Sequence, residues 1–315
     1  MVERRESPVA RPIPVLIVLC LIGLPAHAKY GGGSGTADDP YQIATAADLI
    51  ALGDDPSDYD KHFILTADID LDPNLPGGKV FDDVIIAPLR YAPRGWATPL
   101  FGGIFDGRNH TIRNLTIAGS GYLGLFGGLD IGAAIVNLGL EGVDIDSTAG
   151  DAGSLAGWNE GGITNCFSTG VVHALARVGG LVGWNLSRIR NCYSTGAVSG
   201  LAGVGGLVGE NSNLGTIANC YSAGVVSGNS PACGGLIGMG ILSDVLASFW
   251  DIQVSGQTTT SGAGIGKTTA EMQTAGTFLE AGWDFAGETK NGTEDIWWID
   301  EGKDYPRLWW EAAQP

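Results

Sequence analysis

The chain has 315 residues, a formal net charge of −17, and 51 glycines in a sequence that is 44% hydrophobic. The acidic balance argues against nucleic acid or an anionic membrane surface as a partner, because like charges repel. The glycines recur at regular intervals between hydrophobic residues, so they indicate a repeat with a core rather than a disordered chain.

Residues 1–28 have the pattern of a secretory signal peptide. Three arginines precede an apolar run over 14–24, which is too short to span a bilayer, and a small-residue cleavage site ends at Ala28. Cys20 could carry a lipid, but the residue before it is Leu rather than the small residue that a lipobox takes. We therefore expect a secreted, periplasmic or cell-surface protein without a transmembrane segment in the mature chain.

Residues 29–100 are expected to form an N-terminal cap. Thr45 and Asp48 make a capping box for a short helix that Gly53 ends, and the stretch 62–71 alternates like a strand. Such a cap is needed because the first coil of a stacked β-structure exposes an unpaired edge.

Asp68, Asp70 and Asp72 form a D-x-D-x-D pattern just after this strand signal. Clustered carboxylate oxygens are the ligands that calcium prefers. The alternative is a solvated strand face that ends in a Pro turn. The pattern lacks the glycine and the closing glutamate that a known calcium loop has at fixed positions. Calcium is nevertheless the one cofactor that the sequence suggests.

A repeat occupies the centre of the chain, within residues 101–251. Its three copies have the sequences GSLAGWN (153–159), GGLVGWN (179–185) and GGLVGEN (205–211). Each copy is followed by a segment similar to IRNCYSTGAV. The short runs rich in Val, Ile, Thr, Tyr and Phe, broken by Gly and Asn, favour strands over helices. At about 26 residues per repeat, each unit is too short for a propeller blade of about 40 residues. The sequence therefore predicts an all-β fold, a right-handed parallel β-helix with short helical caps at both ends.

In such a fold, equivalent residues of successive coils stack about 4.8 Å apart. An asparagine column would form a side-chain amide ladder and would supply the left-handed backbone of a tight corner. A cysteine column would be a stack of buried thiols rather than disulfides. Leucine and aromatic columns would fill the core. The predicted ladder and thiol columns are Asn114, Asn137, Asn165, Asn191 and Asn219, and Cys166, Cys192 and Cys220.

Residues 252–315 are expected to form a C-terminal cap. Thr268 and Glu271 make a capping box for a helix over 269–280, and aromatic residues between 283 and 310 are expected to seal the last coil. The Gly-Lys-Thr at 266–268 does not complete a phosphate-binding loop, because Ser261 stands where the first glycine is required. We interpret that stretch as a loop.

The phrase G-G-L-V-G-x-N followed by I-x-N-C-Y-[ST]-x-G resembles the GLUG repeat of bacterial secreted and surface proteins. The same repeat accompanies the non-catalytic region of some immunoglobulin-cleaving metallopeptidases. The resemblance is specific over 153–240, and the flanks are also similar to those of multi-GLUG proteins. It implies a parallel β-helix at a cell surface and carries no catalytic residues over. The H-E-x-x-H motif of those peptidases is absent from this sequence.

Trp158 and Trp184 occupy one column, where an exposed pair would form a stacking platform for sugar rings and a buried pair would pack a corner. We expect a surface or extracellular binding, adhesion or scaffold protein with a polysaccharide or a surface protein as partner, and not an enzyme. One alternative is a polysaccharide lyase or hydrolase, and another is a structural envelope spacer. The enzyme would draw on Glu141, Asp144, Asp146, Asp151, Arg177, Arg188 and Arg190.

Overall fold

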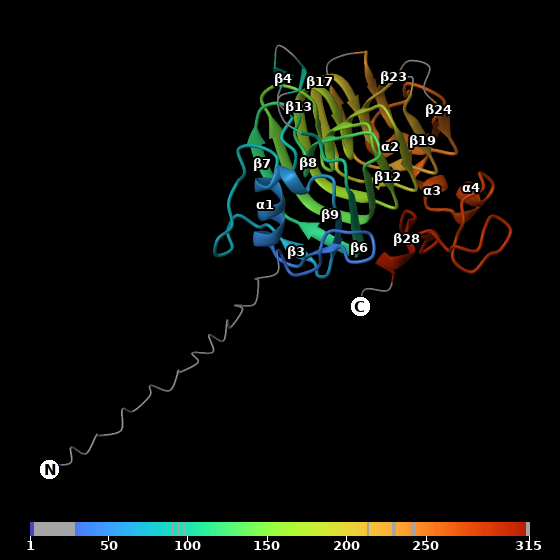
Figure 1. Cartoon of the computed structure of the whole chain (residues 1–315). Coiled ribbons are helices and arrows are strands. Elements are labelled where there is room, and N and C mark those ends of the chain that lie inside the picture. The colour runs from blue at the N-terminus through green and yellow to red at the C-terminus, as the bar shows by residue number, and fades with distance from the viewer. Residues whose placement is uncertain are drawn as a thin grey trace.

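The structure is a computed structural model. It describes residues 1–2 and 29–312, apart from 90, 93–94, 97–98, 213, 229–230 and 241–243. The predicted signal peptide, with Cys20, therefore lies almost wholly outside the described residues. The described chain forms a parallel β-solenoid of about five turns, which confirms the predicted fold class (Figure 1).

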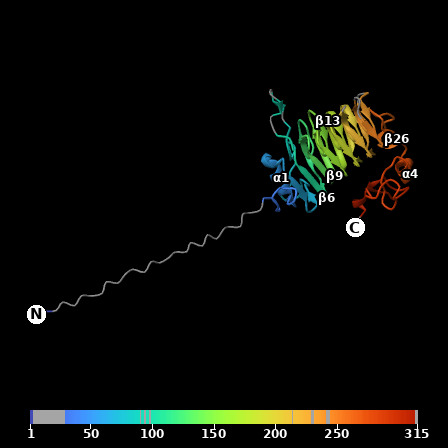
Figure 2. The ribbon, with the colours of Figure 1, turned by 45° about the vertical axis from the view of Figure 1, so that its right-hand side comes forward.

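One repeat of the sequence makes one coil of the solenoid. Phe167 pairs with Tyr193, Tyr193 with Tyr221, and Tyr221 with Phe249 in successive parallel strands. The same register aligns Ile163 with Ile189 on the neighbouring face. The 26-residue period therefore returns the chain to the same face one strand spacing away, and Figure 2 shows the coils side by side.

Two parallel sheets form the walls of the solenoid. The longest strands belong to the larger sheet and are β6 (Ile104–Arg113), β9 (Ala134–Ser147), β13 (Phe167–Gly179) and β17 (Ala197–Gly205). Its shorter central strands are β7 (Thr116–Gly119), β10 (Ala152–Gly153), β12 (Gly162–Thr164), β15 (Arg188–Arg190), β16 (Tyr193–Ser194), β19 (Thr216–Ala218), β20 (Tyr221–Ser222), β21 (Val226–Gly228), β22 (Cys233–Gly234), β24 (Asp244–Leu246) and β25 (Phe249–Asp251). The smaller sheet holds β8 (Phe126–Leu129), β11 (Ala156–Asn159), β14 (Val182–Asn185), β18 (Val208–Asn211) and β23 (Ile237–Gly240).

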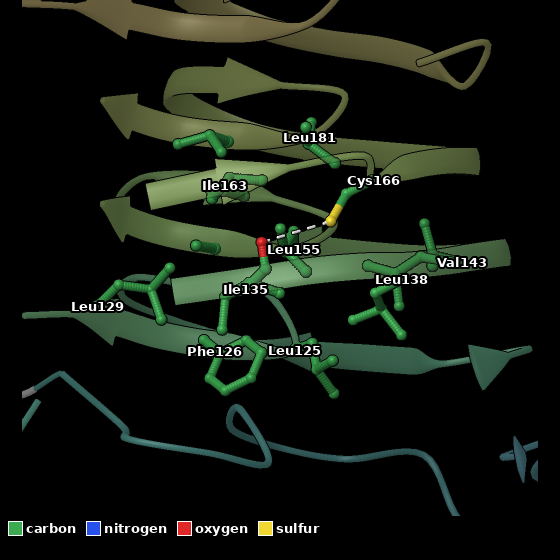
Figure 3. Packing of buried hydrophobic residues seen from close by; sticks show 14 of the residues in the cluster. Leu125, Phe126, Leu129, Ile135, Leu138, Val143, Leu155, Ile163, Cys166 and Leu181 are labelled. Atoms are coloured by element: carbon green, nitrogen blue, oxygen red, sulfur yellow. Dashed lines mark hydrogen bonds between the residues drawn. The ribbon is translucent and has the colours of Figure 1, made fainter. Parts of the chain in front are cut away.

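Columns of apolar side chains fill the space between these walls (Figure 3). The backbone of Leu155 donates to Leu181, that of Leu181 to Leu207, and that of Leu207 to Leu236, each at 2.9 Å, and all four residues are buried. This confirms the predicted leucine column. Glycines that recur in each coil let neighbouring backbone segments approach closely. At Gly205, for example, an added Cβ would lie 2.0 Å from the carbonyl oxygen of Val208.

The N-terminal segment lies against the first coil. It contains β1 (Tyr41–Ile43), α1 (Ala46–Asp54), the 3-10 turn Pro56–Asp58, β2 (His62–Leu65), β3 (Ile69–Asp70), and the short antiparallel pair β4 (Tyr91–Ala92) and β5 (Gly95–Trp96). The predicted capping box of Thr45 and Asp48 begins α1, as expected. The single strand predicted over 62–71 is wrong, because the chain bends between β2 and β3, and the two strands pair with different parts of β6.

The C-terminal segment contains α2 (Ile252–Ser255), β26 (Ile265–Lys267), α3 (Thr269–Met272), α4 (Ala275–Leu279), β27 (Trp297–Trp298), β28 (Arg307–Leu308) and the 3-10 turn Trp309–Glu311. The capping box of Thr268 and Glu271 is confirmed. The continuous helix predicted over 269–280 is wrong, because it is interrupted at Gln273 and Thr274. At this interruption the side-chain Oγ1 of Thr274 donates a hydrogen bond to the backbone carbonyl oxygen of Ala270 (2.9 Å). The expected loop at 266–268 is in part β26, which pairs with β25.

The aromatic residues of this segment pack against the last coil, where Trp283 contacts Phe249 (ring centroids 6.0 Å apart), and they also continue along the side of the solenoid over earlier coils. Trp310 contacts Phe167 (ring centroids 5.5 Å apart), Trp297 contacts Tyr193 (6.3 Å), and Phe278 contacts Phe249 (5.2 Å). The segment therefore runs back along the aromatic column, as the red ribbon in Figure 2 shows. The driving force is burial, since the column would otherwise expose a row of stacked rings to water.

Candidate functional site

The predicted tryptophan column lies on the smaller sheet. Strand register places Trp158, Trp184, Glu210 and Met239 in one row across β11, β14, β18 and β23, and we call this the tryptophan row. The two indole rings have centroids 4.4 Å apart and planes at 66°. Trp158 is only 9% exposed and Trp184 is half-buried. The rings therefore do not share the plane that a stacking platform requires, and Trp184 is the more exposed of the two.

Arg177, near the end of β13, fixes Trp184 in place. Its guanidinium carbon lies 4.1 Å from the centroid of the Trp184 ring, which is the geometry of a cation–π contact. Its Nε donates to Asp151 Oδ1 (2.8 Å), and its Nη1 lies 3.6 Å from Glu210 Oε2. The indole Nε1 of Trp184 donates to Ser212 Oγ (2.7 Å). The guanidinium of Arg177 thus lies between two carboxylates and against the indole ring of Trp184.

Asp151 is the most unusual carboxylate of this cluster. Its side chain is 1% exposed, and burial raises its pKa to about 6 even though Arg177 favours the ionised form. Glu210 raises the pKa further by like-charge repulsion. The second oxygen, Oδ2, has no hydrogen-bond partner among the described residues. A carboxyl group of this pKa can exchange a proton near neutral pH.

The structure separates the other residues that the enzyme alternative would need. Of the predicted set, Asp151 and Arg177 meet, whereas Glu141 pairs with Arg113 Nε (2.8 Å) on another face of the solenoid. The remaining side chains of the set are exposed on their strands, namely Asp144, Asp146, Arg188 and Arg190. The predicted carboxylates therefore do not line a common groove.

The outer asparagine column forms the predicted ladder over four positions. The Nδ2 of Asn165 donates to Asn137 Oδ1 (3.1 Å), that of Asn191 to Asn165 Oδ1 (3.1 Å), and that of Asn219 to Asn191 Oδ1 (3.4 Å). All of them have left-handed backbones, with φ between 52° and 55°. The inclusion of Asn114 is wrong, because its Nδ2 donates to Asp70 Oδ1 (2.9 Å) in a separate register.

A second ladder, which the sequence did not lead us to expect, lies inside the solenoid. Asn159 donates to Asn185 Oδ1 and Asn185 donates to Asn211 Oδ1, both at 2.7 Å, and all three residues are fully buried. Their 26-residue spacing was visible in the repeat, and it was the signal that could have found this ladder. It closes the corner beside the tryptophan row and makes that face rigid.

The cysteine column agrees with its prediction. Cys166, Cys192 and Cys220 are buried and reduced, and Cys233 is half-buried and also reduced. The backbone N–H of Cys166 points at the sulfur of Cys192 (3.4 Å), and the Cys166 sulfur donates to the carbonyl of Ile135 at 3.8 Å, the dashed line in Figure 3. Burial raises the pKa of the Cys192 thiol, so this column is suited to packing and not to nucleophilic chemistry.

The three aspartates of the predicted calcium pattern point to different neighbours. Asp68 pairs with Arg113 Nη2 (3.2 Å), Asp70 accepts from Asn114 Nδ2 (2.9 Å), and Asp72 accepts from the backbone N–H of Asn74 (2.8 Å). Among the described residues, no group of three or more His, Cys, Asp or Glu side chains is placed to hold a metal ion. Calcium at this pattern stays a prediction.

A groove that the sequence did not predict lies between the aromatic column and the C-terminal segment, and we call it the cap groove. It has a volume of about 390 Å³. Tyr193 Oη donates to Glu311 Oε2 (2.6 Å), and the N–H of Leu308 donates to Glu311 Oε1 (2.7 Å). Burial raises the pKa of Glu311 to about 7, and Glu141 across the groove raises it further. No local pattern could reveal this pair, because Tyr193 and Glu311 are 118 residues apart.

Comparisons with known proteins identify the repeat. The family model of the GLUG motif matches residues 174–199, which form most of one coil. Residues 174–199 therefore carry the GLUG motif. The equivalent coils before and after it have the same strand register, and their sequences are similar to the matched stretch.

The relatives are longer proteins with surface-type names. Halomucin of Haloquadratum walsbyi is 33% identical over 152 residues, which are 46% of this chain and 2% of halomucin. A protein of Evansella cellulosilytica named as a Gly-rich membrane protein is 32% identical over 152 residues, 46% of this chain and 16% of that protein. The chain thus matches a small part of either relative. None of the helices in the described part of this chain has the length and apolar character to cross a bilayer.

One solved structure shares the fold along most of both chains. It is the crystal structure of a candidate immunoglobulin A1 protease from Bacteroides ovatus, with a TM-score of 0.65 over 89% of this chain and 95% of that one. The two sequences are 20% identical, so the likeness concerns the fold alone.

Proposed function

We propose that this protein is a surface or extracellular binding module and that its ligand is a glycan held at the tryptophan row. The observation that carries the proposal is the clamped edge of Trp184, held between Arg177 and Trp158 beside Glu210. Sugars combine C–H surfaces, which pack on aromatic rings, with hydroxyl groups, which bind charged side chains. The names of halomucin and of the Gly-rich membrane protein support a location at the cell surface.

The row also adjoins a hollow that could receive a chain of sugars. This hollow has a volume of about 650 Å³ and is lined by Glu210, Met239 and Thr260 among others. A ligand lying across the row would contact the Trp184 edge and reach the hollow through Glu210. Because the buried asparagine ladder holds these strands, little conformational entropy is lost on binding.

The test is retention of the chain over residues 29–315 by a panel of immobilised polysaccharides, with and without calcium. We expect retention that Trp184→Ala abolishes and Glu210→Gln weakens. Trp309→Ala is the matched control, since Trp309 is 46% exposed but lies on the C-terminal segment. If Trp184→Ala is retained as well as the unchanged chain, the tryptophan row is not the site. If no glycan retains the chain, the ligand is a protein or the chain is a spacer.

A second candidate function is polysaccharide cleavage, and the two carboxyl groups of raised pKa favour it. Hydrolases of glycans use a carboxylic acid that is protonated near neutral pH. Asp151 at the tryptophan row and Glu311 in the cap groove meet that condition. New reducing ends or unsaturated products from the same panel would establish it, and their loss in Asp151→Asn or in Glu311→Gln would assign the site.

A further inference from the structure

The cap groove brings two carboxyl groups from distant parts of the chain to one surface. Glu311 belongs to the C-terminal 3-10 turn and Glu141 to β9, and both line the groove. The volume of about 390 Å³ lies within the range of about 300–1,000 Å³ that small-molecule sites occupy. The groove therefore has room for a sugar unit beside two groups that can exchange protons.

The two carboxyl groups have different surroundings. Glu311 accepts hydrogen bonds from two neutral donors, Tyr193 Oη (2.6 Å) and the backbone N–H of Leu308 (2.7 Å). The side chain of Glu141 is 39% exposed and accepts from the guanidinium of Arg113 (2.8 Å). Burial raises the pKa of Glu311 to about 7, whereas Glu141 has a cation beside it. Two carboxyl groups in such unlike environments are suited to act as an acid and a base.

Glu311 is better placed than Asp151 to touch a substrate. The side chain of Asp151 is 1% exposed, and its Oδ2 is buried from water. Glu311 is half-buried and lines the groove. Its two hydrogen bonds fix the direction of the carboxyl group, and each oxygen keeps a second position for a hydrogen bond or a proton.

The order of the strands sets the spacing between these two groups. Glu141 lies in β9, and Glu311 is held by Tyr193 of β16. Strand β13 lies between them, because Phe167 pairs with Gly139 on one side and with Tyr193 on the other. The backbones of β9 and β16 are therefore two strand spacings apart, roughly 9–10 Å. Inverting glycosidases hold their carboxyl groups about 6.5–9.5 Å apart to admit a water molecule, and retaining ones about 5–5.5 Å, so the register favours inversion.

The charge of the lining selects the kind of sugar. Glu141 and Asp304 line the groove as acidic residues beside Glu311, and the guanidinium of Arg307 is paired with Asp304. This balance repels an anionic sugar. The hydroxyl groups of Thr169 and Thr195 also line the groove, and they can bind the hydroxyl groups of a neutral sugar.

We propose that the cap groove hydrolyses a neutral polysaccharide, with Glu311 as the general acid and Glu141 as the general base. Glu311 gives its proton to the glycosidic oxygen, and the bond between that oxygen and the anomeric carbon breaks. Glu141 takes a proton from a water molecule, whose oxygen bonds to the anomeric carbon from the opposite face. The new reducing end has the inverted configuration, and exchange with solvent then removes the proton from Glu141 and restores that of Glu311. The inference rests on the second candidate function and assigns its residues.

The experiment is incubation of the chain over residues 29–315 with xylan, mannan, a β-glucan and polygalacturonate, followed by measurement of new reducing ends. We expect cleavage of a neutral polysaccharide and none of polygalacturonate. Glu311→Gln and Glu141→Gln should each lower the rate by about 10²–10⁴-fold. Asp244→Asn is the matched control, because it removes an exposed carboxylate of the same sheet outside the groove and should leave the rate unchanged.

A second measurement separates catalysis from a structural role. A dinitrophenyl glycoside of the cleaved sugar has a leaving group that needs no proton, so Glu311→Gln should hydrolyse it almost as fast as the unchanged chain does. Glu141→Gln should remain slow with this substrate, because the water still needs a base. Proton NMR of the first product should show the inverted anomer. A retained anomer, or equal losses on both substrates in a Glu311→Gln variant that still unfolds cooperatively, would overturn the assignment.

The outcomes separate this proposal from binding at the tryptophan row. New reducing ends that persist in Trp184→Ala but disappear in Glu311→Gln support the cap groove even where no glycan is retained. Retention of a polysaccharide without cleavage of any neutral one overturns the cap groove and leaves the tryptophan row intact. Cleavage that is lost in Asp151→Asn but unchanged in Glu311→Gln also overturns the cap groove, because it places the reaction at the tryptophan row.

Discussion

Truncation of Asn185 is the sharpest test of the inner ladder. Asn185 Nδ2 donates to Asn211 Oδ1 (2.7 Å) and to the carbonyl of Ser187 (2.8 Å), and its Oδ1 accepts from Asn159 Nδ2 (2.7 Å). Asn185→Ala removes the middle member and leaves the amide of Asn159 and the carbonyl of Asn211 facing each other across a gap. Both are fully buried, so water cannot replace the lost partner without a cavity large enough to hold it.

The size of the effect follows from those two orphaned groups. Each buried unsatisfied group costs about 1–3 kcal/mol, so the free energy of unfolding should fall by about 2–6 kcal/mol. The outer ladder offers a comparison, because Asn191 makes longer bonds (3.1 and 3.4 Å). Asn191→Gly removes that amide while keeping the left-handed φ of 52° accessible. We expect it to cost less than Asn185→Ala.

The assay is urea unfolding of both variants and of the unchanged chain. The urea concentration at the midpoint and the slope of the unfolding free energy against urea give the stability of each. Because stacked repeats can unfold in parts, hydrogen exchange of the β14 and β18 amides should accompany it. An Asn185→Ala variant that is no less stable than Asn191→Gly would refute the reasoning, since it would show that the shorter bonds of the inner ladder contribute no more than the longer bonds of the outer one.

Three further predictions concern other parts of the fold. Glu311 (pKa about 7) and Asp151 (pKa about 6) bind protons more tightly in the folded state than in the unfolded one, so the melting temperature should rise as the pH falls from 8 to 5. Glu311→Gln should flatten this rise, and an unchanged slope would contradict the assignment. Gly205→Ala should destabilise the chain by about 1–3 kcal/mol because its Cβ meets a carbonyl at 2.0 Å, whereas Gly276→Ala, with nothing nearer than 3.9 Å, should be neutral or stabilising in thermal melts. In the native chain over residues 29–315, Ellman's reagent should titrate Cys233 and leave the buried thiols unreacted until urea is added, so prompt reaction of all four would refute the packed column.

The repeat itself determined the parallel solenoid. A 26-residue period of short β-favouring runs allows stacking in only one register, because equivalent residues must lie one strand spacing apart. The outer ladder, the leucine column and the reduced cysteine column follow from that register. Both capping boxes, at Thr45 and Thr268, could be predicted because capping depends on residues three positions apart.

Sequence patterns failed where the contacts are long-range. Asn114 belongs to the outer ladder by motif but bonds to Asp70, because the first full coil has a shifted register against β9. The C-terminal aromatic residues were expected at the last coil, where Phe278 contacts Phe249, but the sequence did not predict that others continue back to Phe167 and Tyr193. The hydrophobic effect is non-directional. A cluster of aromatic residues in the sequence therefore predicts that these residues will be buried, but it does not predict which surface they will cover.

The sequence by itself determined the coil, its period and its columns, since each depends on spacing within or between adjacent repeats. Only the tertiary structure decided where the C-terminal segment docks. That docking brings Glu311 to Tyr193 and places Trp297 near Asn219, where both line one pocket. The pKa values of Asp151 and Glu311 likewise depend on burial by distant segments, and such burial arises only when the chain has folded.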